Sequence, residues 1–368
     1  MWKVPYINIS LQHKPIKDSI LKEVEQVILS GQFILGKYVE DFEKEFALLC
    51  ESKFAMGVAN GTDALILSMK VFGIGTGDEV ITAPNSYLAS ASSIALTGAT
   101  PVFVDVRDDF NIDPEKIRKA ISSKTKAIIP VHLTGRPADM DSILEISRKH
   151  NLFVFEDAAQ AVRAEYKNQR VGSFGDTGCF SLHPLKNLSA VGDGGMITTN
   201  DESVYKDLLK LRNHGLINRD ECEVWSLNSR LDALQAAILK VKLPYLKENE
   251  AKRRALADIY SNRIGKYVKV PFDKENEKAV YHTYIIQLEK RDELKEYLTN
   301  HSIDSKIHYP IPIHLQKSAE YLNYRKGDFP VTEKQAQTIL SLPISPELTE
   351  EQVNFVCDTI ENFFTDLS

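Results

Sequence analysis

The sequence predicts an α/β protein with a large domain, built on a mainly parallel sheet of seven strands, and a smaller C-terminal α/β domain. Three observations support this prediction. From Phe54 onwards, short apolar segments alternate with helical ones, which is typical of a parallel sheet covered by helices on both faces. The chain has 368 residues, more than one typical domain needs. Its last third changes to shorter elements in a different order.

The expected strands of the large domain are short apolar segments bounded by turns or helices. They are Ala55–Ala59, Glu79–Ala83, Pro101–Val106, Ala127–Leu133, Leu152–Phe155, Gly178–Leu182 and Met196–Thr199. Helical periodicity is found at Ile16–Leu29, Gly36–Leu49, Ala64–Phe72, Pro114–Ile121, Met140–His150 and Asp201–His214. Helical segments separate most of the expected strands between Ala55 and Phe155, as in a mainly parallel sheet.

The last third is expected to form the small domain. A long charged helix, Leu246–Ile264, opens it. We expect a strand within Tyr281–Leu288, a helix over Asp292–His301, a strand within Ile303–His308 and a final helix from Thr349. The chain is therefore divided into a large domain, residues 1–245, and a small domain, residues 246–368.

Composition excludes several classes of protein. A net charge of −6 argues against nucleic-acid binding, for which a basic face would be expected. The cysteines Cys50, Cys179, Cys222 and Cys357 are scattered without a C-x-x-C pair, so neither a disulfide framework nor a metal site is expected. The N-terminus lacks the pattern of a signal peptide, and no apolar run reaches membrane-spanning length. These features predict a cytoplasmic protein without a membrane partner.

Two candidate catalytic side chains follow two expected strands. Asp157 comes after Leu152–Phe155, and Lys186 comes after Gly178–Leu182. Ligands of open α/β sheets bind at the carboxyl ends of strands. A lysine there can form an imine with the aldehyde of pyridoxal phosphate, while a carboxylate keeps the pyridine nitrogen protonated and the ring electron-accepting. The same lysine can then carry a proton at the substrate carbon.

Each of these residues also has an ordinary structural interpretation. A lysine after a strand is most often a solvated surface residue, and an acidic residue there often caps a helix. Glu156 and Asp157 are adjacent, so they point to opposite faces of a strand and cannot form the facing carboxylate pair of a glycosidase. The two segments together are more informative than either residue alone.

A strand-to-helix turn at Asn60–Ala64 is a candidate phosphate site. Backbone N–H groups and the helix dipole favour an anion at such a turn, so Gly61 and Thr62 are expected to donate to a cofactor phosphate. An ordinary capped helix start is the alternative. The glycines of Gly73–Gly77 follow a helix and precede a strand, the wrong order for a dinucleotide fingerprint, which disfavours a nicotinamide enzyme.

Several motifs resemble, in order, those of the DegT/StrS type of pyridoxal-phosphate-dependent nucleotide-sugar aminotransferases, which have the fold-type I architecture. The motifs are VPYINISLQ from Val4, GVANGTDAL from Gly57, FEDAAQA from Phe155, GSFGDTGCFSLHPLKNLSAVGDGGMITTND from Gly172, LRNHG from Leu211, NSRLDALQAAIL from Asn228 and IHYPIPIHLQ from Ile307. They cover nearly the whole chain. The resemblance is specific for the family and the cofactor and less so for the substrate.

The resemblance implies roles for individual residues. Lys186 would hold pyridoxal 5′-phosphate as a Schiff base, and Asp157 would be the partner of the ring nitrogen. The cofactor-binding residues implied are Gly61, Thr62, Tyr87, Asp157, Gln160, Ser181, Lys186 and Asn228. Tyr87 would lie against the ring, Gln160 would touch its hydroxyl, and Ser181 would contact the phosphate. Asn228 would reach the phosphate of a partner subunit, which implies a homodimer with shared active sites.

The implied reaction has two halves. L-Glutamate gives its amino group and leaves as 2-oxoglutarate, and a nucleotide-linked keto-sugar then accepts the amine. His308, Tyr309 and His314 lie in a proline-rich loop, where they can bind the sugar or cap structure. The loop resembles that of members acting on 3-keto-6-deoxy sugars, carried by dTDP, UDP or GDP, more than that of members acting on 4-keto sugars.

The chain departs from the family pattern near the substrate. Val162 and Arg163 replace a histidine and a glycine, Thr134 and Arg136 alter an H-L-Y-G-Q motif, and His183 replaces a common tyrosine. These changes leave the cofactor residues intact and border the expected position of the sugar.

Three other functions of the same fold are considered. A sugar dehydratase replaces the Schiff-base lysine by histidine, and Lys186 argues against it. A non-catalytic regulator is disfavoured by the set of Asp157, Gln160 and Lys186. An enzyme for amino acids differs in its amine acceptor, which would be a small 2-oxo acid.

Overall fold

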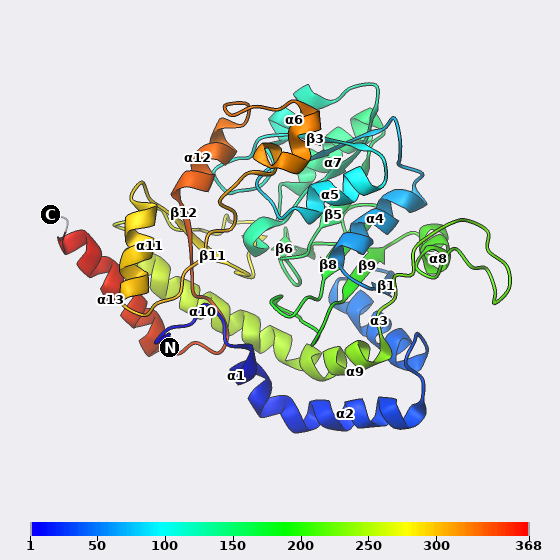
Figure 1. The fold of residues 1–368 in the computed structure, drawn as a ribbon, viewed down its shortest axis with the longest axis horizontal. Coiled ribbons are helices and arrows are strands. Elements are labelled where there is room, and N and C mark those ends of the chain that lie inside the picture. Colours follow the sequence, from blue (N-terminus) through cyan, green and yellow to red (C-terminus); the bar gives the residue numbers. More distant parts are fainter. Residues whose placement is uncertain (1, 367–368) are drawn as a thin grey trace.

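A seven-stranded sheet forms the centre of the computed structural model, which describes residues 2–366 (Figure 1). Its strands are β1 (Phe54–Val58), β2 (Glu79–Thr82), β3 (Thr100–Phe103), β4 (Thr125–Ile129), β5 (Phe153–Asp157), β8 (Thr177–Ser181) and β9 (Gly195–Thr199). Their order is β1-β9-β8-β5-β4-β2-β3. Strand β9 is antiparallel to both neighbours, and the pairs from β8 to β3 are parallel. The predicted sheet is confirmed.

Helices cover both faces of this sheet because its strands are apolar on both sides. In the central strands, Val154 and Phe180 pack on one face, and Phe155 and Cys179 pack on the other, as the two-residue period of a strand requires. The first face carries α3 (Lys37–Leu49), α6 (Pro114–Ala120), α7 (Met140–His150) and α9 (Ala233–Lys242), with α2 (Lys17–Ser30) outside α9. The second carries α4 (Gly61–Val71), α5 (Ala89–Leu96) and α8 (Glu202–Leu211).

The C-terminal part has its own core. Helices α10 (Leu246–Ile264), α11 (Arg291–Asn300) and α13 (Glu350–Asp366) pack with the antiparallel pair β11 (Tyr284–Gln287) and β12 (Ile339–Leu342). Val4, from the start of the chain, is part of this core and forms a β-bridge with Ile303. The division at residue 245 remains a prediction, and the first residues lie with the C-terminal core.

Some elements differ from those expected. Ile303–His308 is not a strand, because its residues form only the isolated bridges Ile303–Val4 and Lys306–Ser341. The predictions lacked α5, β12 and α12 (Pro330–Thr338). Short two-residue strands, β6 (Glu165–Tyr166), β7 (Gln169–Arg170) and β10 (Glu277–Lys278), form a further small sheet.

Shorter helices complete the description. They are α1 (Ile9–His13) and the 3-10 helices η1 (Lys14–Ile16), η2 (Leu133–Gly135), η3 (Leu243–Tyr245), η4 (Ile313–Leu315) and η5 (Lys317–Leu322). Within residues 2–366, no helix is both long enough and apolar enough to cross a bilayer.

Candidate active site

Lys186 and Asp157 lie at the carboxyl ends of two paired strands. Asp157 is the last residue of β5, which runs parallel to β8, and Lys186 lies in the tight turn after β8. The side chain of Lys186 is partly accessible but deeply placed among protein atoms, and this burial lowers its pKa to about 8 against the opposing effect of the Asp157 charge. A useful fraction of this amine is therefore neutral near pH 7.

The carboxylate of Asp157 is held in place by two hydrogen-bond donors. It is 6% exposed, and its Oδ2 accepts a hydrogen bond of 2.7 Å from the hydroxyl of Ser90. The N–H of Ala159 donates to Oδ1 at 3.2 Å. Ser90 lies on α5, a helix that the sequence did not predict, so this partner was not expected. The remaining faces of the carboxylate can meet a cationic group.

Glu156, the neighbour of Asp157, has a structural environment. It is fully buried and accepts hydrogen bonds of 2.7 to 2.8 Å from the N–H groups of Gly172, Phe174 and Gly175. It also contacts the ring of His132 at 3.0 Å. These four partners occupy both oxygens of Glu156. The two adjacent carboxylates therefore have different partners, and Glu156 stabilises the fold.

The start of α4 lies directly against β8. Asn60 caps the helix through the N–H of Asp63 at 2.8 Å. The N–H groups of Gly61 and Thr62 have no hydrogen-bond partner within residues 2–366. A Cβ on Gly61 would lie 2.9 Å from the Cβ of Ser181, so only glycine lets the helix start approach this serine. Two free donors and a hydroxyl thus converge, as an anion site requires.

Gln160, Tyr87 and Tyr309 lie beyond Asp157. The amide of Gln160 accepts from the N–H of Thr134 at 2.8 Å and contacts the hydroxyl of Tyr309 at 3.5 Å. The rings of Tyr87 and Tyr309 are 5.8 Å apart, and Tyr87 remains 58% exposed. An exposed aromatic face beside a buried carboxylate suits a flat ring.

Two histidines from the C-terminal part lie close enough to Lys186 for its charge to affect their pKa. Burial, together with the charges of Lys186 and Lys306, lowers the pKa of His308 to about 4. Burial and the charge of Lys186 also hold the pKa of His282 well below its usual value. Both rings are therefore neutral at physiological pH. Nothing in the sequence around His282 distinguished it, and only the fold brings it to this site.

The ring of His308 is oriented by residues distant in sequence. Its Nδ1 lies 2.9 Å from the Oγ of Ser341 on β12, and its ring lies 5.7 Å from that of Tyr6. Ser341 is fully buried. A bonded Nδ1 leaves Nε2 as the free polar atom of His308.

The remaining predicted residues lie apart from this group. His314 is buried and bonds to Glu333 at 3.2 Å beside the ring of Phe329. His183 is exposed at the turn before Lys186, and its Nδ1 accepts from the N–H of Leu185 at 3.2 Å. Asn228 is exposed at the base of the loop after α8 and forms no hydrogen bond with the site within residues 2–366.

The two arginines that depart from the family pattern form ion pairs. Arg136 bonds Glu277 at 2.9 Å, and Arg163 bonds Glu250 at 2.7 Å. Arg136 is 4% exposed. Both side chains therefore join the large domain to the segments around α10 and β10, and their cationic groups are neutralised there.

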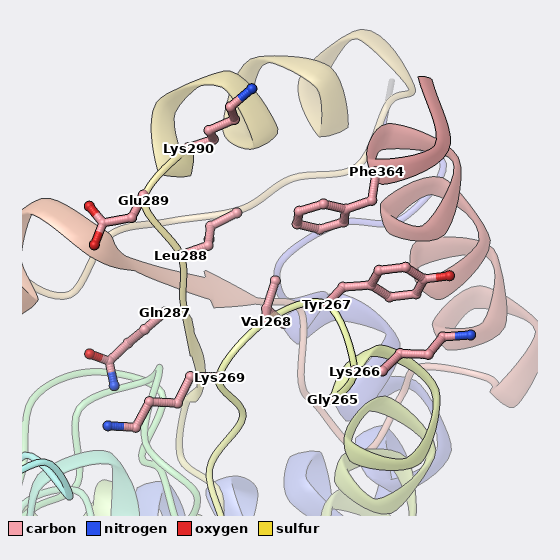
Figure 2. Close-up of a pocket in the computed structure, with 10 residues that line it drawn as sticks. All are labelled: Gly265, Lys266, Tyr267, Val268, Lys269, Gln287, Leu288, Glu289, Lys290 and Phe364. Carbon is pink, nitrogen blue, oxygen red and sulfur yellow. The ribbon is translucent and has the colours of Figure 1, made fainter. Parts of the chain in front are cut away.

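A separate hollow of about 450 Å³ lies in the C-terminal part (Figure 2). Tyr267 and Phe364 stand on one side of it, and Lys266, Lys269 and Lys290 point in different directions. It contains no residue of the group around Lys186. Its diverging charges do not form a site for one ligand.

The chain matches known proteins over nearly its whole length. A sequence model of the DegT/DnrJ/EryC1/StrS aminotransferase family matches residues 14–361. A dTDP-3-amino-3,6-dideoxy-alpha-D-galactopyranose transaminase of Aneurinibacillus thermoaerophilus is 42% identical, with 98% of this chain and 99% of the relative covered. A pleiotropic regulatory protein of Geobacillus stearothermophilus is also 42% identical, with 98% of each chain covered.

Solved structures agree with the sequence comparison. Streptomyces venezuelae DesV, crystallised in complex with a ketimine intermediate, superposes with a TM-score of 0.96 at 38% identity, and 99% of each chain is covered. The predicted fold-type I architecture is confirmed by this agreement. The chain belongs to the DegT/DnrJ/EryC1/StrS aminotransferase family.

Proposed function

We propose that the protein is a pyridoxal-phosphate-dependent transaminase that moves an amino group from L-glutamate to a nucleotide-linked keto-sugar. The observation that carries the proposal is one group of residues. It combines a lysine of lowered pKa, a buried carboxylate, and two free helix N–H groups beside a serine. These are the partners that a cofactor with an aldehyde, a basic ring nitrogen and a phosphate needs.

The residues fit this cofactor at each of its functional groups. Gly61, Thr62 and Ser181 would hold the phosphate, and Asp157 would hold the ring nitrogen. When bound, pyridoxal phosphate supplies an aldehyde that captures amines and a protonated ring that accepts electrons. Lys186 is then the amine of this chain that meets the aldehyde.

Lys186 also serves as the proton carrier in this proposal. Burial disfavours its charged form, so its pKa of about 8 lies close to neutral pH. A group with such a pKa both accepts and returns a proton efficiently. His282 and His308, kept neutral by burial, offer hydrogen bonds beside it without competing for the proton.

The sugar is proposed to be a 3-keto-6-deoxyhexose carried by dTDP, with UDP or GDP as alternative carriers. The first support is the name of the Aneurinibacillus relative, which refers to a sugar that carries its amino group at C3. The second is the sequence of the Tyr309–Gln316 loop. His308 and Tyr309 are proposed to contact the sugar, and His183 is proposed to border it. A 4-keto sugar is the alternative substrate. A dehydratase and a regulator without catalysis are less favoured, although the Geobacillus relative bears a regulatory name.

We also propose a homodimer in which Asn228 serves the partner's site. The loop that ends at Asn228 exposes Trp225 to 87% and Ile217 to 51%, which is costly for a surface that stays in water. Light scattering of the cofactor-loaded protein should give about twice the chain mass of 41.5 kDa. An active species of one chain would contradict the shared site.

The cytoplasm is the proposed location. Its reducing conditions keep thiols unpaired, and all four cysteines are free, with Cys50, Cys179 and Cys357 buried.

The test of the function uses the visible absorbance of the bound cofactor. L-Glutamate should change the spectrum and release 2-oxoglutarate in an amount equal to the enzyme. A dTDP-3-keto-6-deoxyhexose should then restore the original spectrum, and a 4-keto isomer should do so more slowly.

Lys124→Ala is the control for Lys186→Ala. It removes an exposed lysine and should respond to L-glutamate and the keto-sugar as the wild type does. Protein that binds the cofactor but shows no spectral change with any keto-sugar would contradict the proposed substrate class. Failure to bind the cofactor at all would contradict the transaminase.

A further inference from the structure

A cavity of about 370 Å³ lies behind the loop that carries Lys186. Its lining residues come from the N-terminal segment around α1, the turn after β8, the junction of α9 and α10, and the segment before α13. Figure 1 shows the labelled elements α1, α9, α10 and α13 in the ribbon. Its apolar lining includes Leu11, Pro15, Ile16, Leu188 and Leu246. Its volume lies in the range of small-molecule sites.

Glu347, in the wall of this cavity, is a carboxylate without a hydrogen-bond partner among residues 2–366. Both of its oxygens are buried, and neither accepts a hydrogen bond from any of residues 2–366. It forms no ion pair in this part of the chain. An unpaired buried carboxylate is strongly unfavourable, so such groups normally mark a missing donor or cation.

Lys242 provides the opposite charge in the same wall. It is 8% exposed and donates to the Oγ of Ser189 at 2.7 Å, with His13 Nε2 at 3.1 Å. No carboxylate within residues 2–366 forms an ion pair with it, although it feels the charge of Glu347. An ammonium group has three donors, so one remains after these two contacts.

Two opposite charges therefore line one cavity without touching each other. A simple cation placed there would face Lys242, and a simple anion would face Glu347. A ligand with both charges satisfies both, while the apolar lining accepts a hydrocarbon side chain. We propose that this cavity binds a small zwitterion with an apolar body, of the chemical class of an apolar L-amino acid.

The cavity is separate from the Lys186 site but is connected to it. Asn187 and Leu188 belong to its wall, whereas Lys186 does not. The side chain of Asn187 contacts His282 at 3.3 Å and donates to the carbonyl of Val280 at 3.2 Å. A bound ligand would therefore contact Asn187, the residue next to Lys186. The cavity is thus suited to an effector that alters the Lys186 site.

L-Leucine is the probe, and its two truncated analogues test the two charges. Calorimetric titration of the cofactor-loaded protein should show saturable binding of L-leucine. 4-Methylpentanoate, which lacks the ammonium group, and 3-methylbutylamine, which lacks the carboxylate, should bind at least tenfold more weakly. Equal binding of all three would reduce the site to an apolar hole and overturn the proposal, as would no binding of L-leucine.

Variants locate the site. Glu347→Gln and Lys242→Met should each weaken L-leucine at least tenfold. The matched controls are Glu248→Gln and Lys252→Gln, which line the same cavity but pair with each other at 2.8 Å and are largely exposed. They should leave the affinity within twofold. If Lys242→Met fails to fold, Glu347→Gln and the analogues still decide the question.

The Lys186→Ala background separates the two sites. Binding of L-leucine should persist there, because Lys186 is not part of the cavity. Loss of binding in this variant would place the ligand at the Lys186 site and overturn the proposal.

Discussion

The two sides of the candidate site are built in different ways. The sheet side, formed by Gly61, Asp157, Ser181 and Lys186, comes from the ends of neighbouring strands and the start of one helix. The C-terminal side, formed by His282, His308, Tyr309 and Ser341, comes from separate segments of the C-terminal part of the chain. Residues on the first side have positions dictated by local sequence, so the chemistry common to the family belongs there. The second side depends on packing and can vary with the sugar.

The largest effect is expected on the sheet side, from Lys186→Ala. Loss of the amine that is proposed to capture the cofactor and move the proton should lower kcat by about 10²–10⁴-fold or more. The free energy of unfolding should change little, since the amine is partly accessible and has no hydrogen-bond partner within residues 2–366. Single-turnover rates and thermal unfolding measure the two quantities. A Lys186→Ala variant with near wild-type kcat would contradict the assignment of the chemistry to the sheet side.

The adjacent carboxylates should separate chemistry from stability. Asp157→Asn keeps the shape and the contact with Ser90 but removes the charge, and should lower kcat about a hundredfold. Glu156→Gln, the matched control, loses part of a buried network and should cost about 1–3 kcal/mol of unfolding free energy with kcat largely kept. Denaturant unfolding and steady-state kinetics of both variants provide the test. Equal effects of the two substitutions on kcat would contradict it.

The pKa of Lys186 can be tested by capture of the cofactor by cofactor-free protein. The neutral amine is the nucleophile, and burial lowers its pKa to about 8. The rate should rise about tenfold for each pH unit below 8 and level off above it. Stopped-flow absorbance between pH 6 and pH 10 measures the rate. A rate that still rises steeply towards pH 10 would indicate an ordinary exposed lysine.

A smaller effect is expected on the C-terminal side, from Ser341→Ala. It removes the partner of His308 Nδ1, a hydrogen bond worth about 0.5–1.5 kcal/mol, and so should raise KM for the sugar about two- to tenfold. The glutamate half-reaction should keep its rate. Ser305→Ala is the control, because its buried hydroxyl has no partner within residues 2–366. An equal change in both variants would indicate loss of packing alone.

The sequence predicted the features that are formed by residues close together in the chain. The seven strands and the placement of Asp157 and Lys186 at paired strand ends follow from short apolar runs and the polar residues after them. Gly61 and Ser181 also lie together, as expected of two motifs at one sheet edge. Their roles in binding the cofactor remain predictions.

Features that depend on contacts between distant segments were predicted less well from the sequence. Ser341 lies on a strand of only four residues, and Ser90 on a small-residue helix without clear periodicity, so neither element was predicted. Ile303–His308 has the composition of a strand but lacks a continuous partner, since Val4 and Ser341 each offer one bridge. Pairing, not propensity, decides whether such a segment is a strand.

By itself, the sequence determined the family, the sheet and the polar residues at its carboxyl edge, because strand periodicity and the turn after each strand act over a few residues. Only the tertiary structure decided that Arg136 and Arg163 are neutralised by ion pairs and that Ser341 orients His308. It also decided that Lys242 and Glu347 line one cavity and form no ion pair with any of residues 2–366. Those outcomes depend on distances between residues far apart in the chain, which burial and packing fix and local sequence does not.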